Sequence, residues 1–389
     1  MNVLWIAPLA LIEDGHVQPA SWLMPLAKAL VSSNVNLTVL ACNSTIQKDI
    51  VEIEYQNIKV VYIKSPKLKL DFITLYQLRI NKVKKYLKKI VNTFDILHIH
   101  GTEHQYEVMS IDLKIPKIIS IQGIMSEYIK VVPLSRWKQF LEWRLSAFYE
   151  LQYIPKNHHY FCTTKWDSTF IKSVNPQAKI YMIWKMVREE FNNDHFSPQS
   201  NNILFVGGRN PIKGLRELLC AYNSSVQSLG FKLIILGRCV FDDIQNIIDE
   251  ENLESISTDN IDCRGMQDAR GMIKAYKESY CLVHPTYIDN DPLSVCEAQL
   301  SGLPVIATDV GGVSSLIEHE QTGLLIDDGP KAIEIAIKKL LDDGLLREHI
   351  SKKSRRVARK RHDSEVIRSK TLAIYKEVIS ETKNDSLCQ

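Results

Sequence analysis

Short apolar runs rich in valine and isoleucine alternate along the chain with longer stretches in which apolar residues recur at helical spacing. This alternation is typical of βαβ units, and therefore of parallel sheets covered by helices. In the first half, the pattern predicts strands at 3–7, 37–41, 60–63, 96–99, 117–121 and 179–183. A second series follows at 203–207, 232–236, 280–284 and 304–308. We therefore expect an α/β protein with two doubly wound, Rossmann-like domains.

The segment between the two series indicates where the domains meet. Residues 192–202 (NNDHFSPQSNN) contain almost no apolar side chains, which is typical of a linker. We predict a first domain over 1–192, a linker over 193–202 and a second domain over 203–363. Residues 364–389 begin with apolar positions at helical spacing, after the basic run 352–362, and predict a C-terminal helix. Ligands are expected at the carboxyl ends of strands and in the cleft between the domains.

Composition narrows the class of protein. Of the 389 residues, 45% are apolar and 24% are charged, which excludes disordered chains and disulfide-rich miniproteins. The 48 Lys and Arg against 45 Asp and Glu are too balanced for a dedicated nucleic-acid binder. The longest apolar stretch, residues 3–12, contains a proline and is far shorter than the roughly 20 residues of a membrane-spanning helix. It also lacks the basic start of a signal peptide.

The eight cysteines form no Cys-x-x-Cys pair, and no predicted helix carries two histidines at the spacing of metal ligands. Several cysteines lie in apolar runs, where a free thiol behaves as a small hydrophobe. We therefore expect buried free thiols, no bound metal and a cytoplasmic location.

Common nucleotide and hydrolase motifs are missing from the expected places. The loop after the first strand, APLALIEDGHVQPASW (7–22), has a lone Gly15 rather than G-x-G-x-x-G, which disfavours a dinucleotide oxidoreductase. The chain contains neither a G-x-S-x-G elbow nor a Walker loop.

The informative glycines lie in the second half. In ILFVGGRNPIKGLRELLCAY (203–222), a predicted strand ends at Gly207-Gly208, a turn carries Arg209 and Lys213, and Gly214 leads into a helix. A helix start and two cations near the carboxyl end of a strand suit a diphosphate. Two solvated cations on a surface loop are the alternative.

A second cluster, HPTYIDNDPLSVCEAQLSGLPVIATDVGG (284–312), places Asp289, Asn290 and Asp291 on a loop and Glu297 on the helix that follows. The amides of Leu293 and Ser294, near the helix start, can bind oxygen atoms. Carboxylates accept hydrogen bonds from sugar and ribose hydroxyls. A merely acidic helix start would explain Asp289 and Asp291, but not the rest of the arrangement.

Taken in this order, GGRNPIKG, DNDPLSVCEA and SGLPVIATDVGG resemble the motifs of family-four retaining glycosyltransferases of surface and capsular polysaccharide synthesis. The resemblance extends to DILHIHGTEH (95–104), SIQG (120–123) and TTKWDSTFIKSVNP (163–176). It implies the GT-B fold, with two Rossmann-like domains facing a central cleft and the C-terminal helix returning to the N-terminal, acceptor-side domain.

The resemblance also implies roles for single residues. Arg209 and Lys213 would hold the donor diphosphate, Asp289 would face the donor sugar and Glu297 would bind the ribose. The Leu293 and Ser294 amides would contact sugar and phosphate oxygens. Further substrate contacts are expected from Gly208, Gly237, Arg238, Arg264, Gly265 and Met266. The family usually has Glu where this chain has Asp289, and a Gly-Gly loop where it has Gly15-His16.

In the first domain, His98 and His100 alternate along a predicted strand, and Glu103 and His104 follow in the loop. We consider His100 and His104 for contacts with donor sugar or acceptor, against the commoner fate of a buried structural histidine.

Basic residues gather in the first domain. Residues 64–89 hold nine Lys and Arg but one acid, and Trp137, Phe140 and Trp143 are interleaved with Arg136, Lys138 and Arg144. Such segments suit an anionic membrane surface. A solvated helix face over a core stripe explains the first segment equally well.

Together these features predict an enzyme that transfers a sugar, with retention, from a nucleoside diphosphate-sugar, either UDP- or GDP-linked, to a glycan or lipid-linked glycan. It would need no cofactor and bind no nucleic acid, and it could contact the inner face of the membrane peripherally. A GT-B nucleotide-sugar 2-epimerase and a degenerate, non-catalytic nucleotide-sugar-binding assembly partner are the alternatives.

Overall fold

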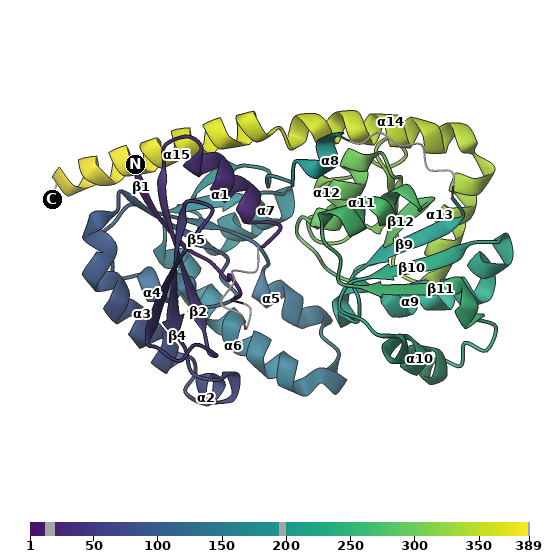
Figure 1. Ribbon diagram of the computed structural model, residues 1–389, viewed down its shortest axis with the longest axis horizontal. Coiled ribbons are helices and arrows are strands. Elements are labelled where there is room, and N and C mark those ends of the chain that lie inside the picture. The colour runs from purple at the N-terminus through teal and green to yellow at the C-terminus, as the bar shows by residue number, and fades with distance from the viewer. Residues whose placement is uncertain (12–19, 194–199, 388–389) are drawn as a thin grey trace. The chain divides into compact units, whose positions relative to one another are not determined.

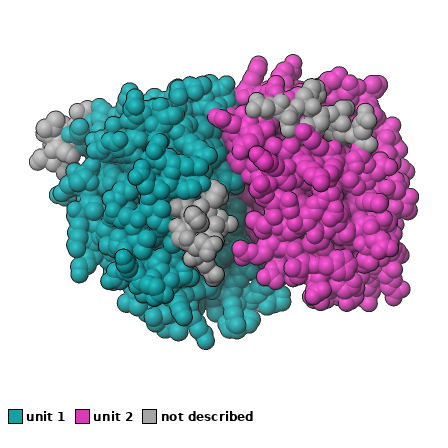
Figure 2. Space-filling view, viewed as in Figure 1, with its two compact units in different colours: residues 1–186, 363–389 teal, residues 187–362 magenta. Residues whose placement is uncertain are grey.

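The computed structural model describes residues 1–11, 20–193 and 200–387 (Figure 1). The chain forms two compact units, which Figure 2 distinguishes by colour. Unit 1 consists of Met1–Met186 and Asp363–Gln389, and unit 2 of Val187–His362. Each unit is described by itself below.

The chain enters unit 2 earlier than predicted, at Val187 rather than beyond residue 192. Arg188 is bonded to Glu297, and the ring of Phe191 lies 5.8 Å from that of Tyr276. These contacts tie the end of the predicted first domain to unit 2. Most of the predicted linker, residues 194–199, lies outside the described residues.

Unit 1 is built on one eight-stranded sheet with the order β3-β4-β2-β1-β5-β6-β7-β8. Its strands are β1 (Asn2–Ile6), β2 (Asn36–Asn43), β3 (Ile50–Tyr55), β4 (Ile58–Lys64), β5 (Ile96–His100), β6 (Lys117–Ser120), β7 (His159–Cys162) and β8 (Lys179–Met182). All neighbours are parallel except β3 and β4, which form a hairpin. Gln56 and Asn57 of its two-residue turn both have positive φ, as such hairpins require.

Helices cover both faces of this sheet. They are α1 (Met24–Val31), α2 (Leu68–Ile73), α3 (Gln77–Ile90), α4 (Tyr106–Ser110), α5 (Met125–Tyr128), α6 (Trp137–Tyr153), α7 (Lys165–Val174) and α15 (Ser364–Leu387). Side chains of α3, α4, α6 and α7 pack in the core of one face. Those of α1 and α15 pack in the core of the other, where Ile374, Tyr375 and Val378 are buried. The predicted return of the C-terminal helix to the N-terminal unit is therefore confirmed.

Unit 2 is built on a six-stranded parallel sheet with the order β11-β10-β9-β12-β13-β14. Its strands are β9 (Asn202–Val206), β10 (Lys232–Leu236), β11 (Ile261–Gly265), β12 (Cys281–His284), β13 (Val305–Thr308) and β14 (Leu324–Ile326). Its helices are α8 (Glu190–Asn193), α9 (Leu215–Ala221), α10 (Phe241–Glu250), α11 (Ala269–Lys277), α12 (Leu293–Ser301), α13 (Pro330–Asp342) and α14 (Gly344–Arg361). The predicted pair of doubly wound α/β domains is confirmed.

Four strands were not predicted, and each of them is short or lies at the edge of its sheet. β3 and β11 lie at sheet edges and expose alternate or polar side chains. β14 is three residues long and also lies at an edge, and β7 is a four-residue strand beginning with His159.

Candidate active site

The sheet of unit 2 changes direction of winding between β9 and β12. From β9 the chain moves to β10 and β11 on one side, and β12, β13 and β14 lie on the other. At such a switch point the loops after the two central strands diverge, and ligands of doubly wound sheets bind there. The loops after β9 and β12 carry Lys213 and Asp289.

Glycines let the loops after β9 and β10 touch through their backbones. A Cβ on Gly208 would lie 2.6 Å from the backbone nitrogen and oxygen of Arg238, and one on Gly237 would lie 2.6 Å from the nitrogen of Gly208. The Arg209 amide donates to the Arg238 carbonyl at 3.0 Å, and the Gly237 amide to the Gly265 carbonyl at 2.9 Å. The structure thus brings the predicted residues Gly208, Gly237 and Gly265 together at the carboxyl ends of β9, β10 and β11.

A second close approach joins the loops after β9 and β12. Gly214 has a φ of +75°, and a Cβ there would lie 1.8 Å from the carbonyl oxygen of Pro285. The Ile212 carbonyl accepts hydrogen bonds from the Thr286 hydroxyl at 2.8 Å and the Tyr287 amide at 2.9 Å. The turn that carries Lys213 is therefore fixed to the loop that carries Asp289.

Lys213, Asp289 and His284 form a polar group at this switch point, in which His284 is buried and the other two are partly buried. The Lys213 ammonium pairs with Asp289 Oδ2, and His284 Nε2 lies 3.2 Å from the same oxygen. Burial alone would raise the pKa of Asp289, but Lys213 and His284 hold it below its usual value. Burial and the nearby Lys213 lower the pKa of His284, so a neutral imidazole that donates through Nε2 fits best.

Two backbone features complete this corner of unit 2. The Gly312 amide donates to the Asp289 carbonyl at 2.9 Å, and a Cβ on Gly311 would lie 2.2 Å from that oxygen. The Gly311-Gly312 turn therefore supports the Asp289 loop. Leu293 and Ser294, half-buried, are the first residues of α12, so their amides have no acceptor within the helix and can serve a ligand.

Arg209 lies on the same turn as Lys213 but is more exposed. Its side chain is 59% exposed and lies 3.4 Å from Asp243 Oδ1, a weak surface contact. A guanidinium held so loosely can turn toward an anion at low cost.

Glu297, predicted to bind ribose, is already engaged. Its carboxylate is 3% exposed and accepts from Arg188 through Nε at 3.1 Å and Nη2 at 2.7 Å. The Tyr276 hydroxyl donates to its other oxygen at 3.2 Å. Burial raises the pKa of Glu297, while Arg188 and Tyr276 oppose that rise. A ribose hydroxyl would therefore have to share this carboxylate with Arg188.

Of the residues predicted to make further substrate contacts, Arg264 pairs with acidic side chains of its own unit. Its guanidinium pairs with Asp262 at 2.7 Å and with Glu278 at 2.6 Å. Met266 follows it with its side chain 68% exposed. The Met266 side chain is therefore exposed to a ligand, whereas the Arg264 guanidinium is occupied by its two partners and the Gly265 carbonyl by the Gly237 amide.

Unit 1 holds a pocket of its own at its switch point, between β1 and β5. His98 and His100 share one face of β5, with ring centroids 3.9 Å apart, and line the pocket together with Trp22, Gln122, Thr163, Trp184 and Lys185. His100 is 4% exposed, and its Nε2 has no hydrogen-bond partner among the described residues. Burial and the charge of Lys185 lower the pKa of His100 to about 3, so its imidazole is neutral at physiological pH.

A hydrogen-bonded chain fixes His98 next to His100. Trp5 Nε1 donates to the Tyr375 hydroxyl at 3.0 Å. The same hydroxyl lies 2.5 Å from His98 Nδ1, and the other ring nitrogen of His98, Nε2, lies 2.6 Å from Ser120 Oγ. Because the Tyr375 oxygen already accepts from Trp5, its proton goes to Nδ1, and Nε2 donates to Ser120. His98 is thus a structural histidine.

The remaining predictions in unit 1 fall in two loops. His104 is exposed, and its backbone carbonyl accepts from Arg79 at 2.8 Å. Gly15 and His16 lie outside the described residues. Within the described ranges, no cluster of three or more His, Cys, Asp or Glu side chains could hold a metal ion.

Sequence reasoning gave no role to Arg188, Tyr276 or the imidazole of His284. Only His284 had a signal, since it ends a strand directly before the Asp289 loop. Arg188 is 109 residues from Glu297 in the chain, and nothing in its local sequence indicates the contact.

The sequence of unit 2 is similar to those of known glycosyltransferases. Residues 187–357 match the family model described as "Glycosyl transferases group 1". The capsular polysaccharide biosynthesis glycosyltransferase CapM of Staphylococcus aureus is 28% identical over 173 residues, which are 44% of this chain and 44% of CapM. The match thus spans less than half the length of that relative. The resemblance to family-four glycosyltransferases is confirmed by these findings.

Solved structures agree over nearly the whole chain. Sucrose-phosphate synthase of Thermosynechococcus elongatus superposes with a TM-score of 0.77 at 17% identity, covering 98% of this chain and 99% of that one. HepE of Anabaena, solved in complex with UDP-glucose, gives a TM-score of 0.68 at 14% identity, covering 99% and 100%. At these identities the likeness concerns the fold, and the predicted GT-B fold is confirmed.

Proposed function

We propose that this chain, with its group 1 glycosyltransferase domain over residues 187–357, moves a sugar from a nucleoside diphosphate-sugar to a glycan or lipid-linked glycan acceptor. The acceptor belongs to surface polysaccharide synthesis, and the configuration at the anomeric carbon is retained. The capsular role of CapM and the UDP-glucose bound by HepE support this choice of acceptor and of donor class.

The observation that carries the proposal is the polar group at the switch point of unit 2. Lys213 meets Asp289 there, Arg209 lies on the same turn with a loosely held guanidinium, and α12 begins nearby with two free amides. Two cations and a helix start suit a diphosphate, and a partly buried carboxylate beside them suits the hydroxyls of the attached sugar.

The reaction then follows from these charges. The bond between the anomeric carbon and the diphosphate oxygen breaks, and negative charge develops on the leaving group. Lys213, and Arg209 once it has turned toward the diphosphate, stabilise that charge. The acceptor hydroxyl forms the new bond on the same face of the sugar, and its proton passes to the leaving phosphate. No side chain has to act as nucleophile.

Alanine variants at Arg209 and Lys213 test the proposal. Release of nucleoside diphosphate from a panel of nucleotide-sugars, beginning with UDP-glucose, should fall by about 10²–10³-fold in each variant. Lys274→Ala, at a side chain 72% exposed on α11, is the matched control and should leave turnover unchanged. Turnover of both variants within a few-fold of wild type would refute the assignment. An isomerised donor formed without acceptor would instead indicate an epimerase.

A further inference from the structure

Unit 1 exposes an unusual number of large apolar side chains in two neighbouring segments. The first segment comprises α2 and the start of α3, with Leu68, Leu70, Ile73, Leu75 and Leu78. The second is α6, with Trp137, Leu141, Phe148 and Leu151. These side chains are between 42% and 70% exposed, and we call them the exposed apolar surface. Single exposed apolar residues need no explanation, but contiguous groups mark interaction sites.

Helix α2 buries an acidic side chain and exposes most of its apolar ones. Asp71 is 5% exposed and points inward, where it accepts from Arg79 Nε at 2.7 Å, while Leu68, Leu70 and Ile73 face outward. A helix on a soluble surface normally buries its apolar side. Here the ion pair with Arg79 holds Asp71 in the interior, and Leu68, Leu70 and Ile73 therefore face the solvent.

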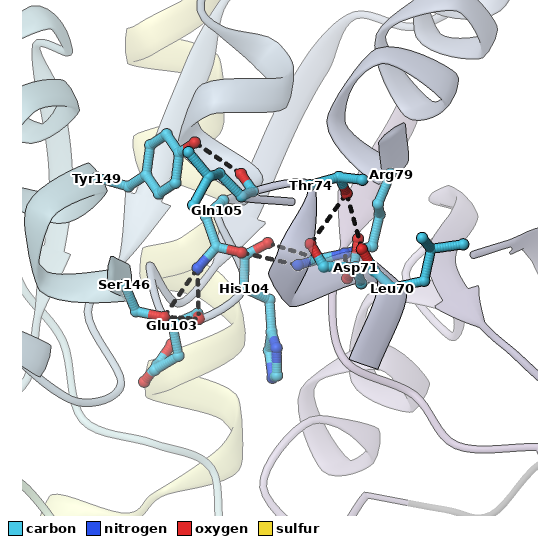
Figure 3. A network of polar contacts seen from close by, with 10 residues as sticks. Leu70, Asp71, Thr74, Arg79, Glu103, His104, Gln105, Ser146 and Tyr149 are labelled. Carbon is cyan, nitrogen blue, oxygen red and sulfur yellow. Dashed lines mark hydrogen bonds and ion pairs between the residues drawn. The ribbon is translucent and has the colours of Figure 1, made fainter. Parts of the chain in front are cut away.

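Figure 3 shows how firmly this orientation is held. Arg79, 7% exposed, also donates to the His104 carbonyl and to Gln105 Oε1, both at 2.8 Å. Gln105 in turn donates to Ser146 of α6 at 3.0 Å. Removing a partner from such a buried network leaves an unpaired charge, so α2 cannot easily turn its apolar side inward.

Helix α6 shows the same feature along its length. Trp137, Leu141, Phe148 and Leu151 follow one another at spacings of three, four or seven residues and so share one helix face, with exposed Arg144 between them. Ser146, Tyr149 and Glu150, on the opposite side, are buried. An apolar stripe that would ordinarily face a core faces solvent instead.

The two segments adjoin. The Tyr149 hydroxyl donates to the Leu75 carbonyl at 2.8 Å and accepts from Gln77 Nε2 at 2.8 Å. The buried side of α6 is thereby bonded to the loop between α2 and α3 and to the first residue of α3, so the two segments are neighbours in unit 1.

Basic side chains surround this surface. They are Lys67 and Lys69 on α2, Lys85 on α3, and Arg136, Lys138 and Arg144 at α6, all exposed. Glu142 is the half-buried acid of α6. The basic helix α3 itself fits the solvated alternative, because Ile80, Val83 and Leu87 are buried in the core. Two of its lysines also pair with acids, Lys82 with Asp49 and Lys84 with Asp112.

We propose that the exposed apolar surface docks on a lipid bilayer that contains anionic headgroups. Its leucines and aromatic rings enter the boundary between headgroups and acyl chains, and the surrounding Lys and Arg bind the headgroups. The helices lie in the membrane surface, since none within the described ranges is long and apolar enough to cross it. The contact requires neither donor nor acceptor, so it stands independently of the proposed sugar transfer.

Vesicle co-sedimentation without substrates tests the proposal. The full chain should bind vesicles of phosphatidylcholine with phosphatidylglycerol, and bind phosphatidylcholine alone about tenfold or more weakly. The double variants Leu68→Ser/Ile73→Ser and Trp137→Ser/Phe148→Ser should each lower binding by about tenfold or more, since exposed side chains are removed from the lipid. Lys67→Glu/Lys69→Glu should lower binding to the anionic vesicles and reduce its dependence on salt.

Leu345→Ser/Ile335→Ser is the matched control, because Leu345 is 81% and Ile335 59% exposed on helices of unit 2. It should bind vesicles like wild type. Absence of binding to the anionic vesicles, or an equal loss in the control, would overturn the proposal. So would a concentration-dependent dimer that Leu68→Ser/Ile73→Ser abolishes, since the surface would then join two copies of the chain. Because turnover is not measured, these results leave the proposed transferase activity to its own test.

Discussion

Arg188→Leu is the most informative single change in unit 2. It removes the guanidinium that donates two hydrogen bonds to Glu297, and leaves a carboxylate that is 3% exposed with only the Tyr276 hydroxyl. Breaking a buried ion pair from one side typically costs about 3–5 kcal/mol. Because Arg188 is itself 19% exposed, we expect a value near the lower end, about 3 kcal/mol. For a cooperative unit of this size that lowers Tm by roughly 6–12 °C.

The loss should depend on pH in a defined direction. Burial already raises the pKa of Glu297 in the folded protein, and Arg188 lowers it. Without Arg188 the folded-state pKa rises further, so the folded chain binds more protons than the unfolded one over a wider range. Stability contributed by such a group is present below the unfolded pKa and is lost as pH rises through the folded pKa. The variant should therefore differ little from wild type at about pH 4 and most at about pH 8.

Thermal unfolding of three variants at both pH values provides the assay. Arg188→Leu/Glu297→Leu should recover most of the stability, since replacing both partners of a buried pair by apolar residues is often neutral. Arg216→Leu breaks a surface pair with Glu251, whose arginine is 61% exposed, and should cost less than about 1 kcal/mol. An unchanged Tm for Arg188→Leu at the higher pH would refute the reasoning. A double variant less stable than the single one would also refute it.

Two further predictions concern the loops at the switch point. Asp289→Ala should leave the affinity for free nucleoside diphosphate nearly unchanged but lower turnover by about 10–150-fold, and Asp289→Glu should retain activity. In calorimetric titrations, Glu297→Ala should weaken binding of the nucleoside diphosphate. Equal affinities for wild type, Asp289→Ala and Glu297→Ala would contradict the ribose role of Glu297. Gly214→Ala should lower Tm well beyond Gly230→Ala. Both glycines have positive φ, but a Cβ on Gly214 meets the Pro285 carbonyl, whereas one on Gly230 meets nothing within 4 Å. Equal losses would show that the contact with Pro285 is unimportant.

The sequence allowed the fold and the central loops to be predicted because their signals are local. Buried parallel strands such as β1 and β9 are continuous apolar runs, and the glycine turns next to Lys213 and Asp289 are short motifs. The edge strands β3 and β11 were missed because a strand with one neighbour can keep exposed polar side chains, which interrupt the apolar run.

Contacts between distant segments could not be predicted in the same way. The partner of Glu297 comes from a segment 109 residues earlier, and the occupation of Arg264 by Glu278 depends on how β11 and α11 meet. The outward side of α2 depends on Arg79, which selects Asp71 as the buried residue. Periodicity places the apolar residues of a helix in the core, which is correct for Ile80, Val83 and Leu87 of α3 but wrong for Leu68, Leu70 and Ile73 of α2.

The hydrogen bond between Trp5 on β1 and Tyr375 on α15 has a consequence for synthesis of the chain. Unit 2, residues 187–362, is inserted between the two parts of unit 1, so α15 leaves the ribosome only after all of unit 2. At about 5–20 residues per second, that interval lasts roughly 10–35 s. During it, the face of β1 that α15 will cover still lacks that helix, and the indole of Trp5 lacks the Tyr375 acceptor. The nascent chain therefore holds an unfinished first unit, with part of its apolar core still uncovered, while its second unit folds.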